Sequence, residues 1–219
     1  MTARSSHLLD HILGAKSKVA ALRVLFNSKV GFSGSTVAKR AGMGLLAIQN
    51  ALADLERLGI VEVERGSVEH RYRLNFKHHI VQHGLRALFE AERDMVKTIA
   101  RELRPLLDGV VVTAGLFGSF ARGDAGTGSD IDLLVIVETA KQRERVSALL
   151  SDKLPEFAER YGLPLQPVIF ERRRLTRANG GMHDLIENAE QDWTPVAGED
   201  LKQIRRMLAL PKTTQRRNA

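Results

Sequence analysis

The chain has 219 residues, of which 43% are hydrophobic and 27% charged, and its formal net charge is +7. No apolar stretch reaches the length of a membrane span, and none reads as a targeting signal. The absence of cysteine excludes disulfides, thiolate zinc sites and cysteine nucleophiles. We therefore expect a soluble, cytoplasmic protein with no membrane partner and with room for two modest domains.

The positive charge is concentrated in the N-terminal third. Residues 1–80 contain 12 Lys and Arg against 6 Asp and Glu, whereas residues 81–219 contain 21 against 20. Such an excess of basic charge indicates a polyanionic partner for this part of the chain.

The same third predicts three helices followed by a two-stranded hairpin. Apolar residues recur at helical spacing, Ser35 is placed to cap the second helix, and Gly59 ends the third. The predicted helices span residues 18–26, 34–41 and 45–58, and the predicted strands span residues 60–64 and 70–74. This order is the layout of a winged helix-turn-helix.

Three segments, AKRAG, LADLERLGIVEVE and RYRLN, fall where winged-helix domains have their second helix, their third helix leading into the wing, and the returning strand of the wing. Residues 16–76 thus resemble the winged-helix domains of bacterial transcription regulators. The resemblance implies that the third helix enters the major groove of double-stranded DNA. The residues implied are Gln49 and Asn50 for base edges, and Lys39, Arg40, Arg65, Arg71 and Arg73 for phosphates.

One feature of the third helix departs from that pattern. Gly44, Leu45, Leu46 and Ala47 occupy positions that are commonly polar and face DNA in this family. Apolar side chains there would meet thymine methyl groups, or would form a protein interface instead. Both interpretations, DNA binding and a structural or partner-binding wing, stay open.

A long amphipathic helix is predicted over residues 81–108, with apolar residues at steps of three and four. A helix of this length spans about 40 Å. It would connect two domains, and it also offers a seam for a homodimer, which suits a regulator that reads a two-fold-symmetric site.

The stretch GLFGSFARGDAGTGSDIDLLVIV, residues 115–137, combines residue types that bind phosphate and metal. After a short apolar strand, Gly118 and Ser119 would let a phosphate approach the backbone at the start of a helix. Asp130 and Asp132 then open a second strand on one face, where they repel unless a divalent ion, most naturally Mg²⁺, lies between them. A lone Asp-x-Asp is more often merely solvated, but the surrounding pattern favours a site.

This order of strand, Gly-Ser, ten intervening residues, Asp-x-Asp and apolar strand resembles the signature of the polymerase-β-like nucleotidyltransferase superfamily, in particular its small "minimal" branch. The resemblance covers roughly residues 103–208. It implies transfer of a nucleoside monophosphate from an NTP to an acceptor hydroxyl, with pyrophosphate leaving. The implied residues are Gly118, Ser119, Arg122 and Ser129 for the nucleotide, and Asp130 and Asp132 for catalysis and for Mg²⁺ or Mn²⁺.

The same family carries a third carboxylate on a later strand, here predicted over residues 163–171. At the aligned position stands Gln166, which cannot take a proton at neutral pH. Glu171 is the nearest acid, but it is an odd number of residues from Gln166, so its side chain is expected on the opposite face of the strand. Only a bulge or a shifted register would bring it to the metal. This departure bears on catalysis more than on nucleotide binding.

The predicted fold class is α+β in two domains. A winged helix-turn-helix domain is expected over residues 1–80, a linker helix over 81–108, and an α/β nucleotidyltransferase-like domain with a mixed sheet over 109–210. Residues 193–198 resemble a closing turn, and 211–219 are expected to be a disordered basic tail.

Two functions follow from these predictions. The first is a nucleotidyltransferase positioned or regulated by a DNA-binding domain. The second is a transcriptional regulator whose catalytically weak nucleotidyltransferase-like domain senses a nucleotide, which Gln166 favours. An antitoxin-like or other protein-partner module also stays open, because apolar residues on the third helix would serve a protein interface.

Overall fold

The computed structural model describes residues 7–28, 30–67, 69–123, 126, 128–175 and 180–207. The chain divides into two compact units, residues 1–92 (the N-terminal unit) and residues 93–219 (the C-terminal unit). Among the described residues, every helix is too short or too polar to cross a membrane. The predicted basic tail over residues 211–219 lies outside the described residues.

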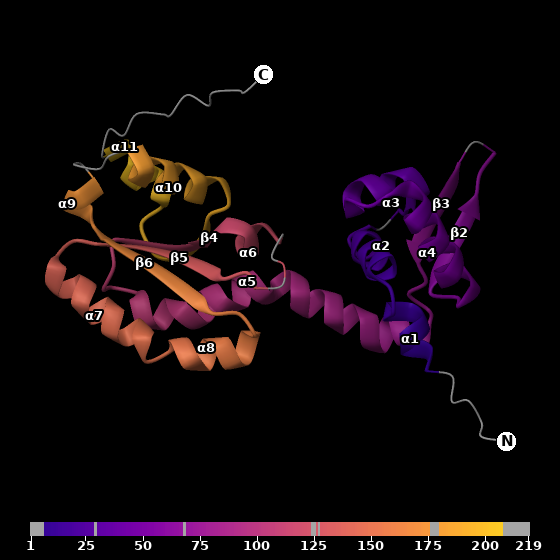
Figure 1. Cartoon of the computed structure of the whole chain (residues 1–219), viewed down its shortest axis with the longest axis horizontal. Coiled ribbons are helices and arrows are strands. Elements are labelled where there is room, and N and C mark those ends of the chain that lie inside the picture. Colours follow the sequence, from indigo (N-terminus) through magenta and orange to yellow (C-terminus); the bar gives the residue numbers. More distant parts are fainter. Residues whose placement is uncertain are drawn as a thin grey trace. The chain divides into compact units, whose positions relative to one another are not determined.

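The N-terminal unit combines helices with a small antiparallel sheet in the order β1-β3-β2 (Figure 1). The buried side chains of Leu22, Ile48 and Leu52 form the centre of its core. The predicted helices and hairpin are present, with ends that differ by one or two residues. The elements are α1 (Leu8–Leu13), α2 (Lys16–Phe26), β1 (Phe32–Ser33), α3 (Gly34–Ala41), α4 (Leu45–Arg57), β2 (Val61–Arg65) and β3 (His70–Leu74).

Two local features differ from the prediction. Ser33, not Ser35, is the N-cap of α3, and its Oγ accepts a hydrogen bond from the Thr36 amide at 3.4 Å. Ser33 also belongs to β1, a strand that the sequence did not predict and that pairs with β3. Because β1 leads directly into α3, the residue that leaves the strand is the one available to cap the helix.

The long predicted helix begins as a π-helical turn, η1 (Val81–Leu85), and continues as α5 (Arg86–Leu107). Its apolar residues are used within the units: Phe89 is buried in the core of the N-terminal unit, and Ile99 and Leu103 in that of the C-terminal unit. Leu88 is an exception, with 58% of its surface exposed.

The C-terminal unit is built on a four-stranded mixed sheet in the order β6-β5-β4-β7. Strand β4 is antiparallel to both neighbours, whereas β5 and β6 are parallel. This agrees with the predicted mixed sheet and with a nucleotidyltransferase-like fold. The strands are β4 (Thr113–Phe117), β5 (Ile131–Val137), β6 (Leu165–Glu171) and β7 (Thr194–Gly198).

Helices cover both faces of this sheet (Figure 1). Leu133 and Val135 of β5 face the core to which α5 contributes, while Leu134 and Ile136 face the opposite core. This burial of both faces explains why β5 reads as a continuous apolar run. The remaining helices are α6 (Gly118–Arg122), α7 (Ala140–Ser151), α8 (Leu154–Tyr161), α9 (Arg172–Leu175), α10 (Gly180–Gln191) and α11 (Leu201–Met207).

The segment predicted to be a closing turn is the edge strand β7, so that prediction was wrong. Pro195 is exposed in β7 and is tolerated there because an edge strand need not donate every amide to a neighbour. Trp193, just before β7, packs on Gly115 of β4: a Cβ added to Gly115 would lie 2.4 Å from Cζ2 of the indole. Trp193 is therefore a packing residue, which the close approach to a glycine makes possible.

Candidate functional site

The candidate site lies where β4 ends and β5 begins. Phe117, the last residue of β4, is the register partner of Asp132. Gly118 follows with a φ of +79°, and a Cβ at this position would lie 2.4 Å from Asp132 Oδ2. Glycine is therefore required both for the backbone conformation and for space beside the carboxylate. The sheet thus brings the predicted Gly-Ser and Asp-x-Asp segments together.

Ser119 and Arg122 lie on α6, directly after Gly118. Phe120 is buried and anchors this short helix to the core, while Ser119 stays half-buried. Arg122 is exposed, and its Nη1 donates to Asp192 Oδ2 at 2.5 Å. Asp192, which follows α10, was not identified from the sequence, because nothing in its local pattern reveals a partner 70 residues away.

Ser129 closes a turn immediately before Asp130. Its Oγ accepts a hydrogen bond from the Gly126 amide at 2.8 Å, and its own amide donates to the Gly126 carbonyl at 3.1 Å. Ser129 was predicted to contact the nucleotide, and in this structure its oxygen is engaged with the loop. The contacts fix the entry of the chain into β5.

Asp130 is exposed and Asp132 is half-buried. Burial raises the pKa of Asp132, the negative charge of Asp130 raises it further, and the Arg122 guanidinium acts in the opposite direction. A divalent cation held between the two carboxylates would offset both unfavourable effects.

These residues fit a magnesium ion that is bound together with a triphosphate. Among the described residues, no group of three or more His, Cys, Asp or Glu side chains could enclose a metal. A site with two carboxylates leaves the other coordination positions to phosphate oxygens and water, which is the way proteins usually hold Mg²⁺.

Gln166 lies beside Asp132 on the neighbouring strand. The β5–β6 ladder is parallel and unbroken, and it pairs Asp132 with Gln166 and Val137 with Glu171. Register partners on parallel strands point to the same face, so the Gln166 amide is the side chain that β6 presents next to Asp132. Glu171 is five residues further along, about 16 Å at the rise of a strand, and is excluded from the site.

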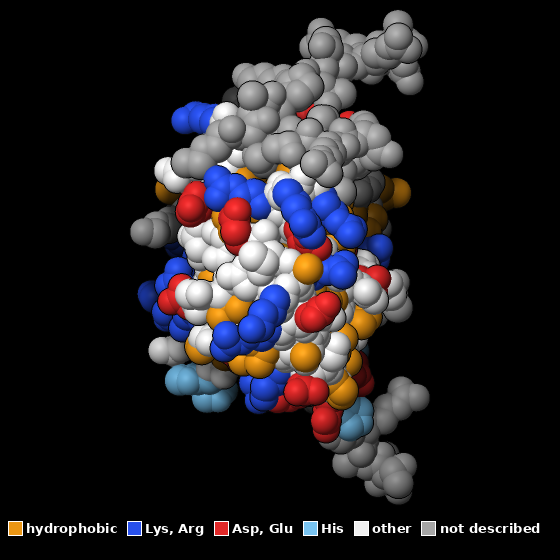
Figure 2. All heavy atoms as spheres, turned by 90° about the vertical axis from the view of Figure 1, so that its left-hand side faces the viewer, with side chains coloured by type: hydrophobic (Ala, Val, Ile, Leu, Met, Phe, Trp, Pro, Cys, Tyr) orange, Lys and Arg blue, Asp and Glu red, His pale blue; other side chains and the backbone are white. Residues whose placement is uncertain are grey.

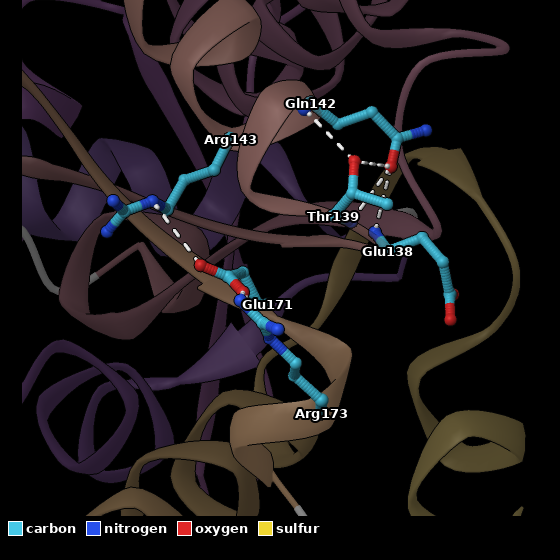
Figure 3. Close-up of polar contacts among 6 residues, drawn as sticks. All are labelled: Glu138, Thr139, Gln142, Arg143, Glu171 and Arg173. Atoms are coloured by element: carbon cyan, nitrogen blue, oxygen red, sulfur yellow. Dashed lines mark hydrogen bonds and ion pairs between the residues drawn. The ribbon is translucent and has the colours of Figure 1, made fainter.

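Glu171 has a different role at the far end of the sheet (Figure 3). Its side chain is 1% exposed and is held by Arg173, whose nitrogen lies 2.6 Å from Oε2, and by Arg143, 3.8 Å from Oε1. A buried carboxylate needs such partners. Glu171 therefore stabilises the junction between β6 and α9.

All the residues predicted to bind DNA are exposed in the N-terminal unit. The arginines of the hairpin are ion-paired within the unit, a feature that the sequence did not reveal: Arg65 with Glu56 at 2.5 Å, and Arg73 with Glu62 at 2.8 Å. Arg71 on β3 lies 3.9 Å from Glu69, and the other positions are Lys39 and Arg40 on α3 and Gln49 and Asn50 on α4.

The apolar start of α4 is also exposed. Leu45 has 46% of its surface exposed and Leu46 71%. The structure therefore presents both the polar and the apolar groups on which the two interpretations of this unit depend.

The match to a known family falls within the C-terminal unit. Residues 94–188 match the family model described as "Nucleotidyltransferase domain". This range includes the Gly-Ser and Asp-x-Asp segments and Gln166.

Two similar proteins come from Methanocaldococcus jannaschii. Over 62 residues the chain is 45% identical to "Putative protein adenylyltransferase MJ1305". The aligned region covers 28% of the chain and 42% of that protein. The chain is 30% identical over 88 residues to "Putative protein adenylyltransferase MJ0141", covering 39% of the chain and 81% of that protein. The chain thus spans less than half the length of the first relative and most of the second.

A solved structure described as "Crystal structure of the toxin-antitoxin with AMP-PNP" is similar with a TM-score of 0.33 and 17% identity, over 54% of this chain and 83% of that one.

Proposed function

Because the chain belongs to the nucleotidyltransferase domain family, we propose that it binds a nucleoside triphosphate with Mg²⁺ or Mn²⁺ and transfers the nucleoside monophosphate to an acceptor hydroxyl. The observation that carries the proposal is the close approach of the Gly118 backbone to the Asp132 carboxylate. A backbone that passes this close to a metal-binding carboxylate would place phosphates and metal side by side. Asp130 and Asp132 would hold the metal, which neutralises charge that develops on the phosphate oxygens.

The printed names of the relatives support a choice of donor and acceptor. Both are named as protein adenylyltransferases, so we infer that ATP is the donor and that a protein side chain carries the acceptor hydroxyl. In the reaction, the hydroxyl oxygen forms a bond to the α-phosphorus while the bond to the pyrophosphate oxygen breaks. The hydroxyl proton passes to solvent or to a nearby base, and pyrophosphate leaves.

Gln166 sets the expected rate of this reaction. The position beside Asp132 is where a third carboxylate would add negative charge to the metal site and accept the proton, whereas an amide brings no charge to the metal and accepts no proton at neutral pH. We therefore propose slow turnover. The second candidate function, a nucleotide sensor without turnover that acts in transcription regulation, is favoured by the same residue.

A transfer assay separates the two candidates. The purified protein is incubated with each of the common NTPs, labelled at the α-phosphate, together with Mg²⁺ or Mn²⁺. Release of pyrophosphate and label on protein, with ATP as the preferred donor, is the expected result. Saturable binding of ATP with neither product over many hours would establish the sensor instead, and absence of any metal-dependent binding would contradict both.

We further propose that the N-terminal unit is a winged-helix domain that binds double-stranded DNA. Its support is the exposure of Gln49 and Asn50 on α4 together with the basic hairpin.

The exposed Leu88 supports the homodimer proposed along the long helix, although the other apolar residues named above on that helix are buried within the units.

For the DNA interface, replacing Arg65, Arg71 and Arg73 together by Ala is expected to weaken duplex binding at low salt by about tenfold or more. The salt slope should fall as well, because each phosphate contact contributes about one unit to that slope. Gel shifts at several salt concentrations measure both quantities. Arg86→Ala is a matched control, since Arg86 is also exposed and paired with a glutamate, at 2.9 Å. Equal affinity of the triple variant and the control variant would favour a partner-binding wing around Leu45 and Leu46.

A further inference from the structure

A groove of about 530 Å³ in the C-terminal unit lies between α5, α6 and the start of β7. Aliphatic side chains, among them Val96, Ala100 and Val196, contribute to its lining. Four exposed cations follow α5 along it, Arg93, Lys97, Arg101 and Arg104. From the first to the last of these residues the helix rises about 16 Å, so the basic stripe is long enough to contact several residues of an extended peptide.

Local contacts hold part of this stripe in place. Arg104 Nε donates to the Val196 carbonyl at 3.0 Å, and Arg101 Nη2 donates to Thr98 Oγ1 at 3.1 Å. Both acceptors are neutral, so these contacts orient the guanidinium groups without cancelling their charge. Asp94 is the acidic neighbour of the stripe: it is ion-paired with Arg93, and the charges of Lys97 and Arg101 also lower its pKa, so one carboxylate is set against the four cations.

Another face of the C-terminal unit carries mixed charge. On the face of the C-terminal unit that carries α7 and α9, Lys and Arg side chains alternate with Asp and Glu (Figure 2). The groove along α5 instead combines cations of one helix with an apolar lining, and this combination is complementary to a ligand that is acidic and partly apolar.

The groove adjoins the candidate site through α6. Ala121, which contributes to its lining, lies on the same short helix as Gly118 and Ser119. Trp193, also in the lining, follows Asp192, the ion-pair partner of Arg122. A ligand in the groove therefore lies next to the helix on which the triphosphate is proposed to bind.

We propose that the groove binds an acidic, partly apolar segment of the acceptor protein and so delivers its hydroxyl to the site. The inference rests on the proposed transfer reaction. A single-stranded nucleic acid fits the groove less well, because such ligands stack their bases on aromatic rings. Trp193, the aromatic residue of the lining, packs on Gly115, and its Nε1 is buried.

The test uses three fluorescein-labelled probes and the full chain without nucleotide. The probes are a peptide of alternating Glu and Leu with one Ser, the same peptide with Lys in place of Glu, and an oligothymidylate of similar length. Fluorescence anisotropy titrations compare wild type with Lys97→Glu/Arg101→Glu. The matched control, Lys141→Glu/Arg145→Glu, makes the same charge change at exposed positions of α7.

The acidic peptide is expected to bind wild type and the control variant alike, and the groove variant about tenfold more weakly. Binding should also weaken as NaCl rises from about 50 to about 500 mM, because the contacts are exposed. No binding of the acidic peptide, an equal loss in the control variant, or tighter binding of the oligothymidylate would each overturn the proposal.

Two further arms keep the result interpretable. If circular dichroism shows that the groove variant is unfolded, Lys97→Gln/Arg101→Gln removes the charges without reversing them and should give a smaller loss in the same direction. ATP binding is measured separately on wild type. Peptide binding without any Mg²⁺-dependent ATP binding would contradict the proposed function and leave the groove assignment standing.

Discussion

The double variant Asp130→Asn/Asp132→Asn is expected to lose Mg²⁺-dependent ATP binding and to reduce any transfer of label by about a thousandfold or more. Asp132 lies next to Gly118, and Asp130 is close enough to act electrostatically on Asp132, so an amide at both positions leaves the metal without charged ligands from this pair. Isothermal titration with ATP and Mg²⁺ measures the binding, and label transfer measures the turnover.

Thermal unfolding should show that the same variant is folded, and in one respect more stable. The pKa of Asp132 is raised in the folded protein by burial and by Asp130. The folded state therefore holds the proton more tightly than the unfolded chain does, and the carboxylate lowers stability as pH rises through the raised pKa. The Asp132→Asn substitution in the double variant removes this penalty. In metal-free buffer the Tm of the double variant should therefore exceed that of wild type at pH 7, and the difference should disappear in acid.

A matched control separates the metal site from a general loss of acidic charge. Asp152 is an exposed carboxylate at the end of α7, and Asp152→Asn should leave ATP binding, turnover and Tm close to wild type. Unchanged ATP binding in the Asp130/Asp132 double variant would contradict the assignment of the site, whatever its stability.

Gln166→Glu is expected to raise the rate of transfer, by about tenfold to a hundredfold. The substitution puts a carboxylate beside Asp132 with no change in side-chain length, where it can complete the metal site and accept the proton of the attacking hydroxyl. The rate of the variant should rise with pH through the pKa of the new carboxyl group. Single-turnover label transfer across a pH series measures both effects.

Two controls make this gain specific. Gln166→Ala should give no gain, because it adds neither a metal ligand nor a base. Gln142→Glu places the same change on α7, where Gln142 belongs to the capping box with Thr139 (Figure 3), and should leave the rate as it is. A Gln166→Glu variant that binds ATP but transfers no faster than wild type would show that the position beside Asp132 does not limit the reaction.

The sequence predicted the central strands well, because burial imposes a strong local pattern on them. Strand β5 is apolar on both faces. It begins directly after Asp130 and ends at Val137, where the apolar run in the sequence also ends. The Gly-Ser and Asp-x-Asp segments were likewise identifiable, since the closeness of Gly118 and Asp132 follows once β4 and β5 pair as an antiparallel hairpin.

The errors and omissions have tertiary causes. Residues 194–198 look like a turn locally and become a strand because β4 offers a free edge. The cap of α3 moved from Ser35 to Ser33 because β1 pairs with β3 and fixes where the helix begins. The ion pair of Arg122 with Asp192 joins residues far apart in the chain, so no local pattern contains it.

The pairing of Gln166 with Asp132 also has an evolutionary consequence. Codons for glutamine and glutamate differ only in their first base, so a single nucleotide substitution exchanges the amide for an acid at this position. The parallel register already holds the residue beside Asp132, and no rearrangement of the backbone is needed. On the proposed function, a population carrying this gene is one point mutation away from a change between a slow and a fast transferase, in either direction.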